Sequence, residues 1–350
     1  MGNNVLVIGN GFDLAHGRKT KYSHFLEWIC NPNDAFKKSH PELLAQNAFP
    51  SCVDSSIMTF LINIFNAKKS LNSWIDLEEE LHTFIRNLNS LIDGLNGEQY
   101  KNDRELFLIR ARSRNIAETT IINQLVSIFH MEGPDVKLND EYIDFWRKLD
   151  KRMVFETIHY ELVDLRKMLE FYLNNVEPLL RDDIKPLDII KQIKPVYVIS
   201  FNYTDTIQKY YNIPDERVCY IHGRLNRNNI VLGYDDSDGG LDDLEFKKYY
   251  QRLIYSTDRI NYGFSIEEDE YGGYHSPDIY FYGHSLDVSD IDILKGLFSK
   301  GGRIFIYCKD ESDRNDKIKN VIKILGKGPA INRIETGAIQ FCIIEPHESS

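Results

Sequence analysis

The chain has 350 residues, 42% hydrophobic and 27% charged, a composition typical of a soluble globular protein that can bury a large core. Its formal net charge of −11 argues against sequence-independent binding to nucleic acid, because no general basic field would attract phosphates. No apolar run approaches the ~20 residues that cross a bilayer, and we see no secretory signal. Five scattered cysteines without Cys-x-x-Cys spacing predict reduced thiols in a cytoplasmic protein and no structural zinc.

A buried strand followed by a glycine turn is expected at the amino end of the chain. Residues 5–8 are apolar, and Gly9 and Gly11 then let the backbone turn sharply and come close to a ligand. A helix is expected from Leu14, with its N–H groups and positive dipole end at the same place. These features predict a phosphate or nucleotide site at Gly9, Asn10, Gly11, Phe12 and Asp13. A turn without a ligand explains the spacing equally well.

Neither of two familiar phosphate motifs is complete in this stretch. The dinucleotide fingerprint requires a third glycine where Leu14 stands, and the phosphate loop requires a lysine where Arg18 stands. The kind of anion is therefore not fixed by these motifs.

The remainder of the chain separates into a helical block and a strand-rich block. From residue 55 to about residue 186, apolar residues repeat at helical spacing, which predicts an all-helical insertion. Strands then alternate with helices, and the expected strands are 196–201, 218–221, 230–234, 278–282, 303–308 and 339–344. This alternation predicts an α/β fold with a Rossmann-like, doubly wound, mostly parallel sheet. We expect a discontinuous sheet domain over 1–54 and 187–350, with the insertion at 55–186.

Polar motifs follow several of the expected strands, at the carboxyl edge where ligands bind in such sheets. In chain order they are Gly9-Asn10-Gly11, Ser200-Phe201-Asn202-Tyr203-Thr204-Asp205, Ile221-His222-Gly223 and Gly283-His284-Ser285-Leu286. This order resembles that of sirtuin-like NAD-consuming domains. More closely, residues 8–17, Tyr22 and Phe25, together with 201–204 and 221–223, resemble the AbiH family of bacteriophage abortive-infection proteins. Residues 74–78 also resemble a segment of that family.

The sirtuin-like resemblance implies that the chain breaks the nicotinamide–ribose bond of NAD. Asn202 matches an asparagine that contacts the nicotinamide ribose or positions water. His222 matches a histidine that interacts with ribose hydroxyls and acts as a base, a task that suits an imidazole near neutral pH.

The resemblance also implies a place for the rest of the nucleotide. The glycines at 9 and 11 would admit the phosphates, and Gly283, His284 and Ser285 would line the adenosine side. Asp13 departs from the small hydroxyl residue usual in sirtuins, and a carboxylate repels a pyrophosphate. We therefore leave three roles open for Asp13, namely binding a ribose hydroxyl, a metal, or an arginine such as Arg18.

Each candidate also has a purely structural interpretation. Asn202 is suited to capping the helix expected near Asp205, and His222 to a hydrogen bond with the backbone. His284 and Ser285 are suited to capping the helix that follows them. The acidic residues at 76–80 are expected to favour a helix start and to face solvent.

The resemblance therefore implies a phage-defence protein that cleaves NAD or a related nucleotide, with Asn202 and His222 as catalytic residues and no metal. A non-catalytic nucleotide-binding sensor and a metal-dependent nuclease or phosphohydrolase that uses Asp13 are the alternatives. Protein deacylation is disfavoured, because no cysteines are spaced as a zinc module. The helical insertion is a candidate for sensing a phage component or for building a homo-oligomer, and the sequence favours neither.

Overall fold

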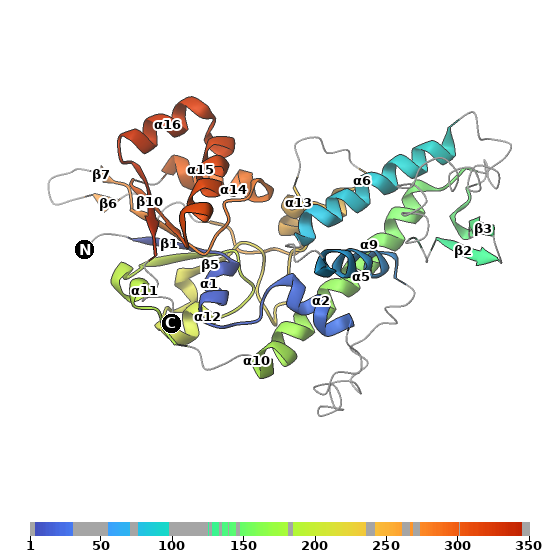
Figure 1. Ribbon diagram of the computed structural model, residues 1–350, viewed down its shortest axis with the longest axis horizontal. Helices are drawn as coiled ribbons and strands as arrows, with labels where there is room; N and C mark the ends of the chain where they lie inside the picture. Colours follow the sequence, from blue (N-terminus) through green and yellow to red (C-terminus); the bar gives the residue numbers. More distant parts are fainter. Residues whose placement is uncertain are drawn as a thin grey trace. The chain divides into compact units, whose positions relative to one another are not determined.

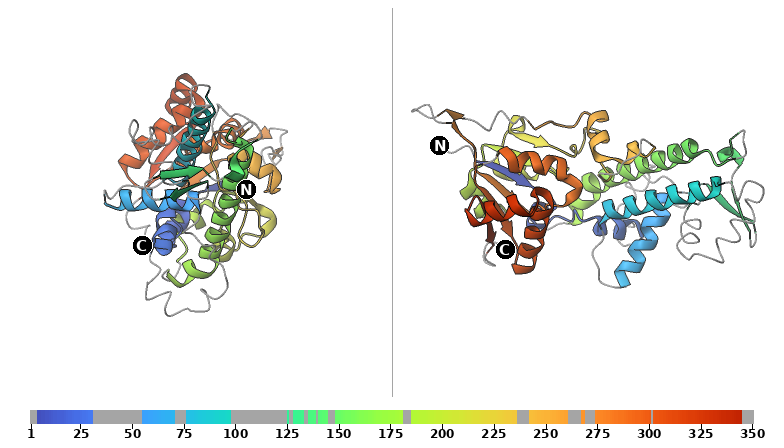
Figure 2. Two further views of the ribbon diagram at one scale, coloured as in Figure 1. Left: turned by 90° about the vertical axis from the view of Figure 1, so that its right-hand side faces the viewer. Right: turned by 90° about the horizontal axis from the view of Figure 1, so that it is seen from above.

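The computed structural model describes residues 4–30, 55–70, 76–97, 125, 128–132, 135–138, 140–144, 148–180, 185–235, 242–260, 267–268, 274–300 and 302–344. The chain divides into two compact units (Figures 1 and 2). Unit 1 comprises Met1–Lys21, Leu173–Val231 and Arg252–Ser350, and unit 2 comprises Tyr22–Tyr172 and Leu232–Gln251. Unit 2 thus includes residues 22–54 and 232–251, which we expected in the sheet domain, and unit 1 includes residues 173–186, which we expected in the insertion.

Six parallel strands form the sheet of unit 1. They are β1 (Val5–Ile8), β4 (Tyr197–Ser200), β5 (Val218–Tyr220), β8 (Ile279–Tyr282), β9 (Ile304–Cys308) and β10 (Ile339–Ile343). Their order is β10-β9-β8-β1-β4-β5, with Ile8 of β1 opposite Ser200 on one side and Tyr282 on the other. Numbered along the chain within the sheet, this is the order 3-2-1-4-5-6 of doubly wound nucleotide-binding folds. The predicted α/β, Rossmann-like fold is confirmed.

Helices cover both faces of this sheet (Figure 2). Along β1, Val5 and Val7 point to one face and Leu6 and Ile8 to the other, as the alternation of a strand requires. The first face packs against α14 (Ile291–Lys300), α15 (Glu311–Leu325) and α16 (Lys327–Glu335). The second packs against α1 (Asn10–Ala15), α11 (Asp188–Ile193) and α12 (Thr206–Tyr211). Burial on both faces explains why the strands are almost wholly apolar.

One expected strand is not formed. Residues 230–233 have no regular structure, and Tyr234 makes only an isolated bridge to Lys247. The apolar side chains of this segment are nevertheless buried. A short apolar run therefore indicated burial correctly and secondary structure wrongly, because burial alone produces the same pattern. Unit 1 also contains α10 (Glu177–Leu180), η5 (Asp215–Arg217), η8 (Val288–Asp290) and the strand pair β6 (Glu267–Glu268) and β7 (Tyr274–His275).

Unit 2 is built mainly of helices. They include α2 (Tyr22–Cys30), α5 (Ser56–Ser70), α6 (Leu77–Asn96), α9 (Lys151–Phe171), η3 (Asp140–Tyr142) and η6 (Leu244–Phe246). A π-helical turn (Tyr172–Val176) follows α9, and α13 (Lys248–Ile254) begins in unit 2. An antiparallel pair, β2 (Phe129–Glu132) and β3 (Asp135–Leu138), lies in the stretch for which the sequence predicts only helices. Among the described residues, no helix combines the length and apolar character needed to cross a bilayer.

The acidic start of α6 is only partly as expected. The carboxylate of Asp76 caps the helix by accepting hydrogen bonds from the backbone N–H groups of Glu78 and Glu79. The side chain of Glu79 is exposed, whereas Glu78 pairs with the buried Lys248 at 2.5 Å. The carboxylate of Glu80 is mostly buried and pairs with Lys68 at 2.5 Å. The expectation that this whole group faces solvent is therefore wrong for Glu78 and Glu80. Trp74 and Ile75, which share the family resemblance, lie outside the described residues.

Candidate functional site

The predicted site residues lie just after four strands, at the carboxyl edge of the sheet of unit 1, and Asn10, Gly11, Phe12 and Asp13 form the start of α1. Gly9–Asp13 follow β1, Asn202 follows β4, His222 follows β5 and Gly283–Ser285 follow β8. The strand order reverses between β1 and β8, and doubly wound sheets bind ligands in the crevice at this switch point. The topology therefore places the two glycine loops where a ligand site is expected.

The two glycine loops pack directly against each other. The backbone N–H of Gly11 donates to the carbonyl of Gly283 at 2.8 Å, and that of Gly9 donates to Tyr282 at 3.3 Å. Gly283 has a φ of +67°, and a Cβ there would lie 2.1 Å from the backbone nitrogen of Phe12. That nitrogen donates to the carbonyl of Gly9 at 2.8 Å. The glycines are thus required by this close packing, and the backbone N–H groups of Gly9, Gly11 and Phe12 all bind within the protein. The helix expected from Leu14 in fact begins at Asn10 and ends at Ala15.

Three other candidates lie in different surroundings. Asn10 accepts a hydrogen bond through Oδ1 from the hydroxyl of Thr20 at 2.5 Å. The ring of Phe12 is fully buried and contacts the rings of His16, Tyr211 and Tyr282 in the core. Ser285 is exposed, and its carbonyl accepts from Asn320 at 3.1 Å.

Asn202 connects the loop after β4 to the loop after β1. Its side chain is buried, and Nδ2 donates to the carbonyl of Gly9 at 3.0 Å. It does not cap α12, whose N-cap residue is Asp205. Within the described part of the chain, Oδ1 of Asn202 has no hydrogen-bond partner. This atom can accept a hydrogen bond from a ligand without breaking a contact that the fold needs.

His222 pairs with a carboxylate and not with the backbone. Its Nε2 lies 2.9 Å from Oδ1 of Asp290, and both side chains are more than nine-tenths buried. The edge-to-face contact between His222 and Phe201 has a centroid distance of 5.3 Å. Sequence reasoning missed Asp290, because its position just before α14 is explained equally well by the helix dipole.

The Phe201 ring connects the two candidate histidines. Its centroid lies 4.3 Å from that of His284, on the loop after β8. Nδ1 of His284 accepts the backbone N–H of Leu286 at 2.9 Å, so the lone pair of that nitrogen is already used. This bond supports Leu286 at a φ of +58°, which costs a branched residue ~1–3 kcal/mol. One continuous set of contacts therefore joins five residues at this edge of the sheet, in the order Asn202, Gly9, His284, Phe201 and His222.

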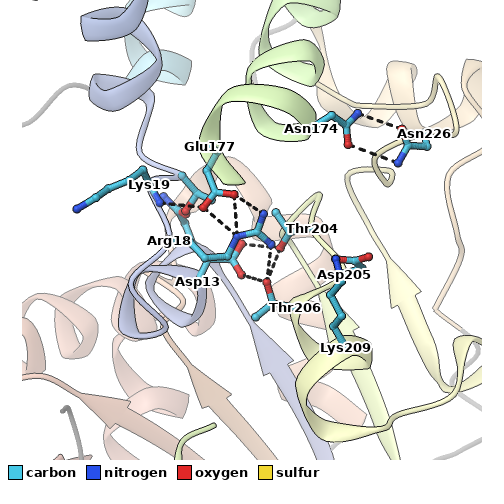
Figure 3. A network of polar contacts seen from close by, with 12 residues as sticks. Asp13, Arg18, Lys19, Asn174, Glu177, Thr204, Asp205, Thr206, Lys209 and Asn226 are labelled. Carbon is cyan, nitrogen blue, oxygen red and sulfur yellow. Dashed lines mark hydrogen bonds and ion pairs between the residues drawn. The ribbon is translucent and has the colours of Figure 1, made fainter. Parts of the chain in front are cut away.

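Asp13 belongs to a buried network beside this site (Figure 3). Thr204 and Thr206 each donate a hydroxyl to its carboxylate at 2.6 Å. Arg18 donates from Nη1 to Thr206 at 2.8 Å and pairs through Nη2 with Glu177 at 2.6 Å. Burial raises the pKa of Asp13, although Arg18 and both threonines act to lower it. The network fastens α1 to the start of α12 and to Thr204 just before it, and both carboxylate oxygens of Asp13 take part.

The described residues contain no group of three or more His, Cys, Asp or Glu side chains that could hold a metal ion. Cys30, Cys219, Cys308 and Cys342 are not part of a disulfide, and Cys52 lies outside the described residues. A family model described as bacteriophage abortive infection AbiH matches residues 5–305. No curated protein and no solved structure matches the chain.

Proposed function

Because the chain belongs to the AbiH family of bacteriophage abortive-infection proteins, we propose that it defends cells against phage by cleaving NAD or a related nucleotide at the nicotinamide–ribose bond. The observation that carries this proposal is the convergence at the carboxyl edge of the sheet. Asn202 bonds directly to Gly9 of the switch-point loop, and His222 is linked to the same group through Phe201. Loss of NAD would then halt the infected cell.

The reaction requires little from the protein besides positioning, removal of one proton and exclusion of stray water. Positive charge builds on the sugar C1 as its bond to nicotinamide breaks, and the electron pair leaves with the neutral nicotinamide. An oxygen of water or of a ribose hydroxyl bonds to C1 and releases its proton. In our proposal Oδ1 of Asn202 orients that oxygen and Nδ1 of His222 accepts the proton.

The polar atoms at this site fit the ribose end of such a ligand. Oδ1 of Asn202 and Nδ1 of His222 have no partners among the described residues, and both residues are only 5% exposed. Polar side-chain atoms that the fold leaves without partners can bond the hydroxyls of a ligand or water. The N–H groups of Gly9, Gly11 and Phe12 are already bonded, so the glycine turn does not supply them to a pyrophosphate.

The alternative uses of the site make different predictions. A non-catalytic sensor would bind the nucleotide through the same atoms without turning it over. A metal-dependent nuclease based on Asp13 finds less support, because the carboxylate of Asp13 is engaged by Thr204 and Thr206.

The proposal is tested by incubating purified protein with NAD and measuring nicotinamide release, with and without lysate of infected cells as a source of trigger. Asn202→Ala and His222→Ala should abolish release. Asn332→Ala, at an exposed position on α16, is the matched control and should retain it. Binding of NAD by the wild type without release under either condition would favour the sensor. Metal-dependent cleavage of nucleic acid would favour the nuclease.

A further inference from the structure

The pair formed by His222 and Asp290 joins two elements that are distant in sequence. His222 follows β5, and Asp290 ends η8 directly before α14, 68 residues later. The contact is short, at 2.9 Å between Nε2 and Oδ1, and almost fully withdrawn from solvent. The position of Asp290 at the start of α14, a ten-residue helix, favours its ionised form.

The direction of this hydrogen bond assigns the protons of the His222 ring. An ionised carboxylate can only accept a hydrogen bond, so the proton between the two groups belongs to Nε2. In the neutral ring the lone pair then lies on Nδ1, the atom without a partner among the described residues. A histidine whose distal nitrogen is held by a carboxylate in this way has both its tautomer and its ring orientation fixed.

The neighbouring histidine is arranged in the opposite way. His284 also contacts Phe201, but its Nδ1 accepts the backbone N–H of Leu286. A backbone N–H can only donate, so the lone pair on Nδ1 of His284 already accepts the hydrogen bond from Leu286. Of the two histidines that flank Phe201, only His222 therefore presents a lone pair that a reacting hydroxyl can use.

We propose that Asp290 is the positioning residue that keeps the proton of His222 on Nε2 and thereby makes Nδ1 the base for the attacking hydroxyl or water. The role of Nδ1 as a base rests on the proposed NAD cleavage, because that reaction supplies the proton that Nδ1 accepts. The arrangement of protons that it predicts is a property of the protein alone. Asp290 does not need to touch the nucleotide, and its effect passes entirely through the imidazole.

The test combines ring 15N NMR with kinetics on the full chain labelled at its histidines. The chain has ten histidines, so the His222 signals are assigned by comparison with His222→Gln. We expect the Nε2–H tautomer of His222 in the wild type. Asp290→Asn should give a mixture of tautomers, because an amide can either accept from or donate to Nε2. Its kcat for nicotinamide release should fall by about 10²-fold or more, with KM changed less than about threefold.

Asp287→Asn is the matched control. Asp287 lies at the start of η8, where its carboxylate accepts the backbone N–H of Ser289 at 2.8 Å, a bond that asparagine can keep. This variant should leave both the tautomer and kcat unchanged. An Nδ1–H tautomer in the wild type, or an unchanged tautomer in a folded Asp290→Asn variant, would overturn the role of Asp290. The wild-type spectrum decides this even if that variant does not fold. A wild type that releases no nicotinamide even with lysate of infected cells would instead refute the proposed function, a separate and distinguishable failure.

Discussion

Replacing Glu177 with glutamine should strongly destabilise unit 1. The carboxylate of Glu177 is fully buried and binds Nη2 of Arg18 at 2.6 Å, Nε of Arg18 at 3.2 Å and the backbone N–H of Lys19 at 3.2 Å. Glutamine keeps the shape but removes the charge and turns an amide donor toward a guanidinium that can only donate. Removing one partner of a buried ion pair costs about 3–5 kcal/mol, since the other charge stays buried. Arg18 keeps its bond to Thr206 and the nearby charge of Asp13, so we expect about 3 kcal/mol.

The assay must follow unit 1 itself. All three tryptophans lie in the segment Tyr22–Tyr172, so tryptophan fluorescence does not report on the sheet. Hydrogen exchange measured by mass spectrometry on peptides from β1 and β4 gives the free energy of opening directly. The control is Glu311→Gln, which breaks an exposed pair with Arg314 on α15 and should cost less than about 1 kcal/mol. An equally small loss in Glu177→Gln would refute the assignment of Arg18–Glu177 as a buried, mutually dependent pair.

Two further predictions concern unit 1. Gly283→Ala places a methyl group 2.1 Å from the backbone nitrogen of Phe12 at a φ of +67° and should cost more than about 2 kcal/mol by hydrogen exchange. Gly328→Ala in α16 meets nothing within 4 Å and should stabilise by about 0.4–1 kcal/mol, so equal effects would contradict the packing argument. Burial lowers the pKa of His16, so its contribution to stability is present above the unfolded value of 6.5 and is lost as pH falls through the folded value. The free energy of opening of β1 should therefore fall as the pH drops below 6.5, and it should fall less steeply in His16→Gln. The same dependence of this free energy on pH in both proteins would contradict the role of His16.

The sequence predicted the sheet well where a strand is buried on both faces. Four apolar residues at 5–8 and the glycine after them were enough to predict β1, because a central parallel strand has no polar face. The same reasoning failed at 230–234, where the chain is buried without joining the sheet. The AbiH resemblance is confirmed by the family model, whereas sirtuin-like chemistry stays a prediction.

The candidate site was predictable only in part. The order of motifs at successive strand ends indicated that Asn202 and Gly9, 193 residues apart, would meet at one edge, and they share a hydrogen bond. The occupation of the glycine N–H groups was not predictable, because it depends on how closely the loops after β1 and β8 approach. Asp290 was missed for a similar reason, since sequence cannot show which buried group faces an acidic residue near a helix start.

In our proposal Asn202 and His222 serve chemistry and not only structure. Its most direct test is cellular NAD during phage infection, measured in bacteria that express either the wild type or Asn202→Ala at equal protein levels. We expect NAD to fall during infection in cells with the wild type, whereas cells with the variant should neither lose NAD nor be protected. Protection by the wild type with NAD unchanged would contradict it.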